Sequence, residues 1–144
     1  MTNVMWTVVS AAGKPYQNGT DVKFTKFYIK KSGNGYRKIV TGNKKNPGKT
    51  LYVEVQHMYD SDGDKADYTY SIWKVENISG KTQKIQKVTK GYYTPITLEE
   101  RMRKTDSVNV CVEGNSKNVS AKISGYIYNF IGTSFGNNND WEVN

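Results

Sequence analysis

The chain has 144 residues, a formal net charge of +8, one cysteine and one histidine. This length predicts a single domain over residues 1–144, large enough to fold without a metal or a disulfide. One cysteine excludes an intrachain disulfide, and one cysteine with one histidine excludes a zinc cluster built from those residues. No run approaches the roughly 18 apolar residues that a membrane-spanning helix needs.

Alternation of apolar and polar residues predicts β-strands along most of the chain. The longest alternating segments are 51–59 and 119–128, and they are rich in Val, Ile and Tyr, which suit a pleated surface. Further strands are expected at 5–9, 22–31, 36–41, 68–73, 82–89 and 108–113. Asn-Gly, Asp-Gly and Asn-Pro-Gly turn signals separate these segments.

About eight short strands with frequent turns predict an all-β fold, an antiparallel β-sandwich of jelly-roll or Greek-key type. At most one short helix is expected, near residues 97–104, because Thr97 and Glu100 have the spacing of a capping box. Apolar positions of the strands form the predicted core: Val53, Val55, Ile72, Val110, Val112, Ile123 and Ile127.

Basic residues are concentrated between Val22 and Val53, where nine lysines and arginines occur without an acid. A basic face on a strand-rich domain is typical of a protein that binds an anionic partner, although plain solubility explains it equally well. The candidate ligand-binding residues in this segment are Lys30, Lys31, Arg37, Lys38, Lys44 and Lys45. We expect charge reversal at Lys44 and Lys45 to weaken binding to anionic polymers and surfaces alike.

Tyrosine is unusually abundant, with eleven copies beside three Trp and four Phe. Exposed tyrosines on a sheet can stack on sugar rings or on unstacked bases, and we add Tyr92 and Tyr93 to the candidate ligand-binding residues. The alternative is a core that uses tyrosine because large aliphatic residues are few.

Four acids lie within eight residues and form a candidate calcium site: Asp60, Asp62, Asp64 and Asp67. Alternating carboxylates can supply the oxygens that calcium requires, but the glycine position and Ser71 depart from an EF-hand loop. A solvated hairpin tip is the alternative interpretation. No other cofactor is predicted.

Lysines recur at every third position from Lys81 to Lys90, which places them on both faces of a strand. Such a strand is expected at a sheet edge, where charge prevents edge-to-edge aggregation; a functional basic ridge is the alternative.

Catalysis has little support in the sequence, and the protein is predicted not to be an enzyme. Cys111 lies in an apolar strand segment and is expected to be a buried, unreactive thiol. His57 is expected to be a packed or partly exposed strand residue, and no motif joins it to Cys111.

Short segments resemble a group of small secreted proteins of unknown function from Gram-positive bacteria. They are Tyr36-Arg37-Lys38, Tyr70-Ser-Ile-Trp73, Val110-Cys-Val-Glu-Gly-Asn115 and Val119 through Tyr126. The resemblance implies a secreted or cell-surface location and brings no catalytic residue. The segment from Met1 to Trp6 is not an intact signal peptide, so export would require a signal absent from this sequence.

Three functions are compatible with these features. The first is an exported, non-enzymatic binding module for an anionic or carbohydrate ligand at the cell surface or wall. The second is a membrane-active toxin or bacteriocin-like protein that acts at an anionic membrane surface. The third is an OB-like single-strand nucleic-acid binder, which is disfavoured because only three of the 21 basic residues are arginines.

Overall fold

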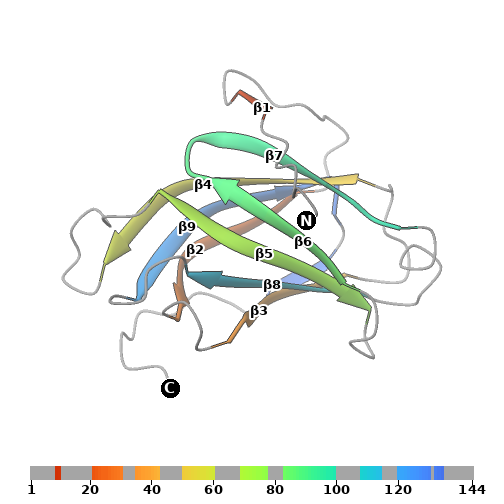
Figure 1. The fold of residues 1–144 in the computed structure, drawn as a ribbon, viewed down its shortest axis with the longest axis horizontal. Coiled ribbons are helices and arrows are strands. Elements are labelled where there is room, and N and C mark those ends of the chain that lie inside the picture. The colour runs from red at the N-terminus through yellow and green to blue at the C-terminus, as the bar shows by residue number, and fades with distance from the viewer. Residues whose placement is uncertain are drawn as a thin grey trace, which may run out of the picture.

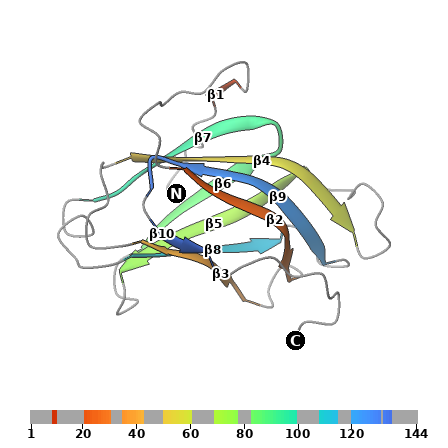
Figure 2. The same ribbon diagram turned by 180° about the vertical axis from the view of Figure 1, so that it is seen from behind.

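The computed structural model describes residues 9–10, 21–30, 35–42, 50–60, 69–77, 83–99, 108–114, 120–130 and 132–134. These residues form two layers of β-strands (Figures 1 and 2). The strands are β1 (Val9–Ser10), β2 (Asp21–Ile29), β3 (Arg37–Gly42), β4 (Thr50–Asp60), β5 (Tyr70–Asn77), β6 (Gln83–Thr89), β7 (Tyr92–Thr97), β8 (Val108–Gly114), β9 (Ala121–Tyr128) and β10 (Gly132–Ser134). The part of the chain that the structure describes holds no helix long and apolar enough to span a bilayer.

Sheet A has the strand order β1-β7-β4-β9-β2, and sheet B has the order β10-β3-β8-β5-β6. The eight longer strands pair antiparallel as β2 with β9, β3 with β8, β4 with β7, and β5 with β6. This nested pairing is that of a long hairpin rolled into two layers, which is the jelly-roll arrangement. The predicted all-β antiparallel sandwich is therefore confirmed.

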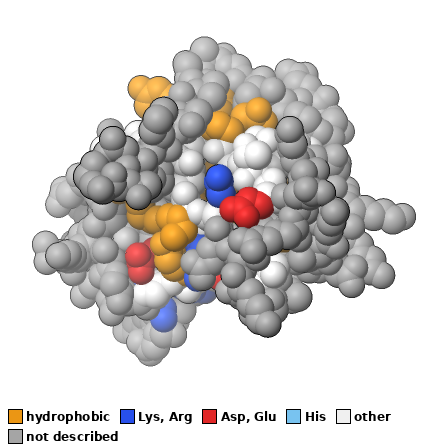
Figure 3. All heavy atoms as spheres, turned by 45° about the vertical axis from the view of Figure 1, so that its right-hand side comes forward, with side chains coloured by type: hydrophobic (Ala, Val, Ile, Leu, Met, Phe, Trp, Pro, Cys, Tyr) orange, Lys and Arg blue, Asp and Glu red, His pale blue; other side chains and the backbone are white. Residues whose placement is uncertain are grey.

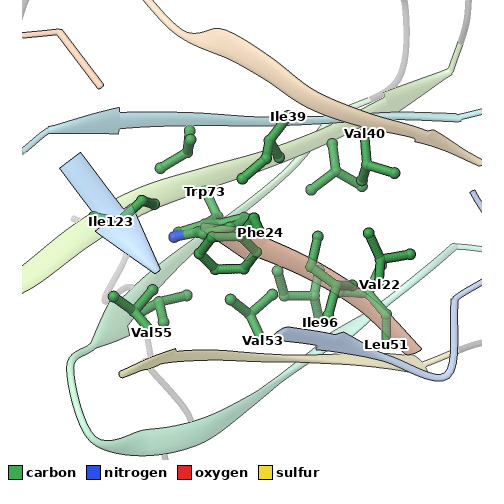
Figure 4. Packing of buried hydrophobic residues seen from close by; sticks show 14 of the residues in the cluster. Val22, Phe24, Ile39, Val40, Leu51, Val53, Val55, Trp73, Ile96 and Ile123 are labelled. Carbon is green, nitrogen blue, oxygen red and sulfur yellow. The ribbon is translucent and has the colours of Figure 1, made fainter. Parts of the chain in front are cut away.

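The core fills the space between the sheets and is built around two aromatic rings (Figure 4). Trp73 of β5 and Phe24 of β2 are fully buried, and their ring centroids lie 5.7 Å apart. The Trp73 indole N–H donates a hydrogen bond of 2.8 Å to the hydroxyl oxygen of Ser71, so the ring is buried without an unpaired donor. Predicted core residues that are buried are Val53, Val55, Val110, Val112, Ile123 and Ile127.

The placement of Ile72 in the core was wrong. In β5 the buried positions are Ser71, Trp73 and Val75, and Ile72 alternates with them on the outer side. A strand buries one of its two sets of side chains, and the set that contains Trp73 removes the largest apolar surface from water. Ile72 is consequently half-buried on the outer face of sheet B.

Irregular pairing shapes sheet A on both sides of β9. The register of β2 shifts between Phe24 and Phe27, and the register of β4 shifts between Val55 and His57. In β4 the shift breaks the strict alternation expected over 51–59: Met58 is buried and His57 is exposed. Such bulges re-aim side chains and bend the strand that carries them.

Gly125 lies at the place where these shifts meet, because it is the partner of both Phe24 and Val55. A Cβ atom added to Gly125 would lie 1.9 Å from the carbonyl oxygen of Glu54 and 3.0 Å from the Phe24 ring. Beside it, Lys26 has a φ of 50° and donates its backbone N–H to the Ser124 hydroxyl at 2.9 Å. The approach of β4 to β9 therefore requires glycine at position 125.

Strand β7 was missed by the sequence reasoning. Pro95 interrupts its pattern, and proline argues against a strand that is paired on both sides. In the structure β1 pairs only with Tyr92 and Tyr93, so Pro95 lies on a stretch that pairs with β4 alone among the described strands. Among the described strands, Pro95 therefore occupies an edge position, where proline is found in sheets.

The short helix expected near 97–104 falls mostly outside the described residues, and Thr97, the cap of the expected helix, ends β7. Leu98 and Glu99 follow without helical structure, and residues 100–104 lie outside the described part of the chain. Pairing of Thr50 with Thr97, including a 3.1 Å contact between their hydroxyl oxygens, extends the strand to this position. The cap residue of a helix has strand-like backbone angles, so this pairing is compatible with the capping box, and the helix stays a prediction.

Among the described strands, β6 lies at one edge of sheet B, as the lysine spacing predicted. Two lysines of β6, Lys84 and Lys87, are half-buried in the structure. They are three positions apart, so their side chains point to opposite sides of the strand. Charge on both sides of an edge strand opposes pairing with another chain.

Candidate functional site

The basic residues predicted to bind a ligand are only partly within the described structure. Lys31, Lys44 and Lys45 lie outside it, whereas Lys30 and Lys38 lie within it. Lys30 directly follows β2, and its carbonyl oxygen accepts the backbone N–H of Gly114 at 3.1 Å. Lys38 is exposed on β3, so these two lysines belong to different sheets and do not extend one strand face.

Arg37 joins the two sheets. It begins β3 of sheet B, and its guanidinium donates to the backbone carbonyl oxygen of Tyr28 in β2 of sheet A. The guanidinium carbon also lies 4.6 Å from the centroid of the Phe27 ring. Burial lowers the pKa of Arg37 from its ordinary value. One of its donors and its planar face are engaged within the protein, which gives this residue a structural role at the side of the sandwich.

The two aromatic residues predicted to bind a ligand, Tyr92 and Tyr93, point to opposite sides of β7. Tyr92 is 42 % exposed, whereas Tyr93 is 6 % exposed, since neighbouring strand residues point to opposite sides. The Tyr93 ring packs against Tyr128 at 5.5 Å between centroids. Only Tyr92 of this pair presents a large accessible surface.

The candidate calcium site lies almost wholly outside the described residues. Asp60 ends β4, and Asp62, Asp64 and Asp67 fall in a segment that the structure does not describe. Within the described ranges no group of three or more His, Cys, Asp or Glu side chains is placed to hold a metal ion. Calcium binding by the acidic loop stays a prediction.

On the outer face of sheet A, tyrosines surround a buried carboxylate. Glu54 of β4 is 6 % exposed and accepts a 2.6 Å hydrogen bond from the hydroxyl of Tyr128, which is 2 % exposed. The side-chain amide of Gln56 donates to the same carboxylate oxygen at 3.3 Å. Tyr126 stacks on Tyr128 with ring centroids 5.6 Å apart. A buried carboxylate needs such donors, and the short distance is that of a charge-assisted bond.

The electrostatics of this cluster follow from its burial. The pKa of Tyr128 is strongly raised, first by burial and then by the hydrogen bond and negative charge of Glu54, with a further contribution from Tyr93. Each of these effects disfavours a phenolate. Tyr128 is thereby kept as a proton donor to Glu54 over the neutral range.

The outer face of sheet B combines lysines, tyrosines, the exposed Ile85 and the half-buried Ile72. Register places Lys38, Lys74 and Ile85 in one cross-strand row through Cys111. Ile72 lies in the neighbouring row, opposite Lys87. We call this surface the tyrosine–lysine face, and its members are Tyr36, Lys38, Tyr70, Ile72, Lys74, Ile85 and Lys87.

Two lysine ammonium groups on the tyrosine–lysine face lie over aromatic rings. The Lys74 nitrogen is 4.5 Å from the centroid of Tyr36, and the Lys87 nitrogen is 4.2 Å from that of Tyr70. Both distances fall within the range of cation–π attraction. The rings hold the ammonium groups in place and leave N–H groups that can donate hydrogen bonds to an anion.

Acidic side chains accompany these lysines, so the face is mixed in charge. Lys74 forms a 3.0 Å ion pair with Glu76, and Glu113 accepts the backbone N–H of Gly35 at 3.2 Å. Burial and the charge of Glu113 raise the pKa of Tyr36. Figure 3 likewise shows basic, acidic and hydrophobic side chains beside one another among the coloured residues. Charge on the described surface is interspersed, and no uninterrupted basic patch is visible in this view.

Cys111 and His57 lie on opposite faces of the sandwich. Cys111 is buried among the side chains on the outer face of sheet B, where burial raises the pKa of its thiol to about 11. His57 is exposed on sheet A and stacks on Tyr59 with ring centroids 5.9 Å apart. The core separates them, so they do not form a thiol–imidazole pair.

Sequence reasoning identified Lys38 but missed the other members of the tyrosine–lysine face as a surface. Once Trp73 is recognised as a member of the buried set of β5, the alternation predicts that Tyr70, Ile72 and Lys74 share the outer side of the strand. The partnership of Tyr36 with Lys74 had no local signal, because 38 positions separate them in the chain.

Comparisons of this chain with protein families, with curated proteins and with solved structures gave no match.

Proposed function

We propose that the protein is an exported, non-enzymatic binding module for an anionic or carbohydrate ligand at the cell surface or wall, and that the tyrosine–lysine face takes an anionic ligand. The observation that carries the proposal is the pair of lysine ammonium groups placed over Tyr36 and Tyr70. A lysine fixed in this way loses less conformational freedom when it meets an anion. The formal charge of +8 attracts such ligands from a distance.

The state of Cys111 supports a binding role over nucleophilic catalysis. With a pKa of about 11, the thiol is almost entirely protonated at neutral pH, and the thiolate is the reactive form. The described surface that combines charged and apolar groups is a sheet face, which suits an extended ligand. Jelly-roll domains serve many unrelated functions, so the argument rests on this face and not on the fold.

A carbohydrate site on sheet A is less favoured. A carboxylate among tyrosines is chemically suited to sugar hydroxyl groups and sugar rings. Glu54 and Tyr128, however, are 6 % and 2 % exposed and are hydrogen-bonded to each other. Their burial gives the cluster a structural role.

Binding of the full chain to dextran sulfate and to uncharged dextran tests the proposal, because these polymers share a backbone and differ in charge. We expect binding to dextran sulfate that weakens steeply between about 50 and 200 mM salt, and no binding to dextran, since lysine contacts are screened by ions. Calorimetric titration measures both. Binding to dextran alone would overturn the anionic assignment, and binding to neither would overturn the proposed function.

Two variants of equal charge separate the face from the net charge. Lys38→Gln with Lys87→Gln removes two charges from the tyrosine–lysine face. Lys23→Gln with Lys26→Gln removes two from exposed positions on β2 of sheet A. We expect a larger loss of dextran sulfate affinity from the first pair. Equal losses would mean that net charge, and not this face, determines binding. A single-stranded oligonucleotide bound more tightly than dextran sulfate, without dependence on this face, would favour the nucleic-acid function instead.

A further inference from the structure

We infer that the anionic partner of the tyrosine–lysine face is a lipid surface, with Ile85 and Ile72 entering the headgroup region. This inference rests on the proposed function and names the class of partner for the same site. It depends on the arrangement of apolar, aromatic and basic side chains, which a soluble polyanion would not require.

The aliphatic part of the face is formed by two neighbouring strands. Ile85 of β6 is 47 % exposed and ends the cross-strand row, next to Lys74. Ile72 of β5 lies on the same outer side, diagonally adjacent to Ile85, because Ile72 pairs with Lys87 and Ile85 pairs with Lys74. Exposing a large aliphatic side chain to water is unfavourable in free energy, and this free energy is regained when the side chain enters an apolar phase.

Tyrosines and lysines surround this aliphatic pair. Tyr70 lies two residues from Ile72 on the same side of β5, with the Lys87 ammonium 4.2 Å from its ring centroid. Tyrosine is favoured at the depth of lipid headgroups, where its ring is partly buried and its hydroxyl stays hydrated. Lysine stems can cover apolar surface while their ammonium groups reach the phosphates.

The charge of the surface is complementary to anionic lipid. On the face itself, positive charge comes from Lys38, Lys74 and Lys87. Two acids lie on the same side: Glu76 is paired with Lys74, and Glu113 is the neighbour of Ile72 on β8. Three lysines against two acids leave the face with a net positive charge. Lysines near a membrane surface each add attraction to acidic headgroups.

Cosedimentation of the full chain with vesicles tests the inference. Vesicles of phosphatidylcholine with phosphatidylglycerol are compared with phosphatidylcholine alone, and dextran sulfate is measured in parallel. We expect binding to the mixed vesicles and little binding to the neutral ones. Ile85→Ser should weaken vesicle binding about five-fold, because it removes one partly buried aliphatic side chain from the interface. Ile85→Trp should strengthen it, since indole is favoured at the headgroup level.

Neither change at Ile85 should alter affinity for dextran sulfate, and that difference separates the two hypotheses. If Ile85→Ser leaves vesicle binding unchanged while the paired lysine change at positions 38 and 87 abolishes it, the lipid inference fails and the anionic binding function stands. If dextran sulfate and mixed vesicles both fail to bind, the proposed function itself fails. Circular dichroism of each variant shows whether the β-sandwich is intact. Release of a dye trapped in the mixed vesicles would favour the membrane-active alternative over a simple docking surface.

Discussion

On the outer face of sheet A the charged group is a carboxylate buried among tyrosines, whereas on the outer face of sheet B lysine ammonium groups lie over tyrosine rings. Glu54 is 6 % exposed and accepts a 2.6 Å hydrogen bond from Tyr128, whereas the Lys74 side chain on the other face is 18 % exposed. The two faces use the same residue types for different purposes. Abundance of tyrosine therefore does not identify a ligand site, and the burial of the charge beside it does.

The largest expected effect comes from Gly125, which underlies the sheet A face. We expect Gly125→Ala to destabilise the protein by about 3 kcal/mol or more, because the added carbon would overlap the Glu54 carbonyl oxygen at 1.9 Å. Urea unfolding followed by tryptophan fluorescence measures the change. Gly91→Ala is the control: Gly91 has a φ of 89° but open space around it, so the cost should be only about 1 kcal/mol. If the two changes destabilised the protein equally, the close approach of β4 to β9 would not be the reason that position 125 needs glycine.

A matched pair of tyrosine changes compares the faces directly. Tyr128→Phe should cost about 1–3 kcal/mol, because Glu54 loses its shortest donor while staying buried. Tyr70→Phe should change stability by less than about 0.5 kcal/mol, because the ring that contacts Lys87 is retained. Thermal and urea unfolding measure both. If the two losses are equal, the contrast between a buried structural cluster and an accessible face is wrong.

The alkaline stability of the protein gives a smaller test of the same contrast. The pKa of Tyr128 in the folded protein is raised, so the folded state holds its proton after the unfolded chain has begun to lose it near pH 10. The resulting contribution to stability is present below pH 10 and declines as pH rises above it. Thermal unfolding between pH 8 and 11 should show a decline that Tyr128→Phe reduces. Tyr36→Phe, on sheet B, should reduce it less, because Tyr36 has no corresponding hydrogen bond to a buried carboxylate among the contacts described. A Tyr128→Phe protein with an unchanged decline would contradict the assignment.

Several elements were predictable because they depend on local pattern. The alternation of Val53 and Val55 identified the buried side of β4, and lysines on both sides of β6 identified an edge strand. Prediction failed where distant contacts decide. Trp73 displaced Ile72 from the core, and β7 was not recognised because Pro95 interrupts its pattern.

The candidate site was predictable only in part. Lys38 and Tyr92 are accessible as expected, but Arg37 is engaged between the sheets and Tyr93 is packed against Tyr128. Counting charges along the chain cannot separate these cases, because exposure depends on which strand lies opposite. The acidic loop and Lys44 and Lys45 lie outside the described residues, so their roles stay predictions.

The sequence by itself determined the class of fold and most of the strand positions, because period-two alternation and turn residues act over a few positions. The tertiary structure decided the partners across the sheets: Tyr36 beneath Lys74, Tyr128 against Glu54, and Gly125 against the backbone of β4. These contacts join residues that are 38 to 74 positions apart. Their register follows from bulges and from the packing of the core, which no short segment of the chain specifies.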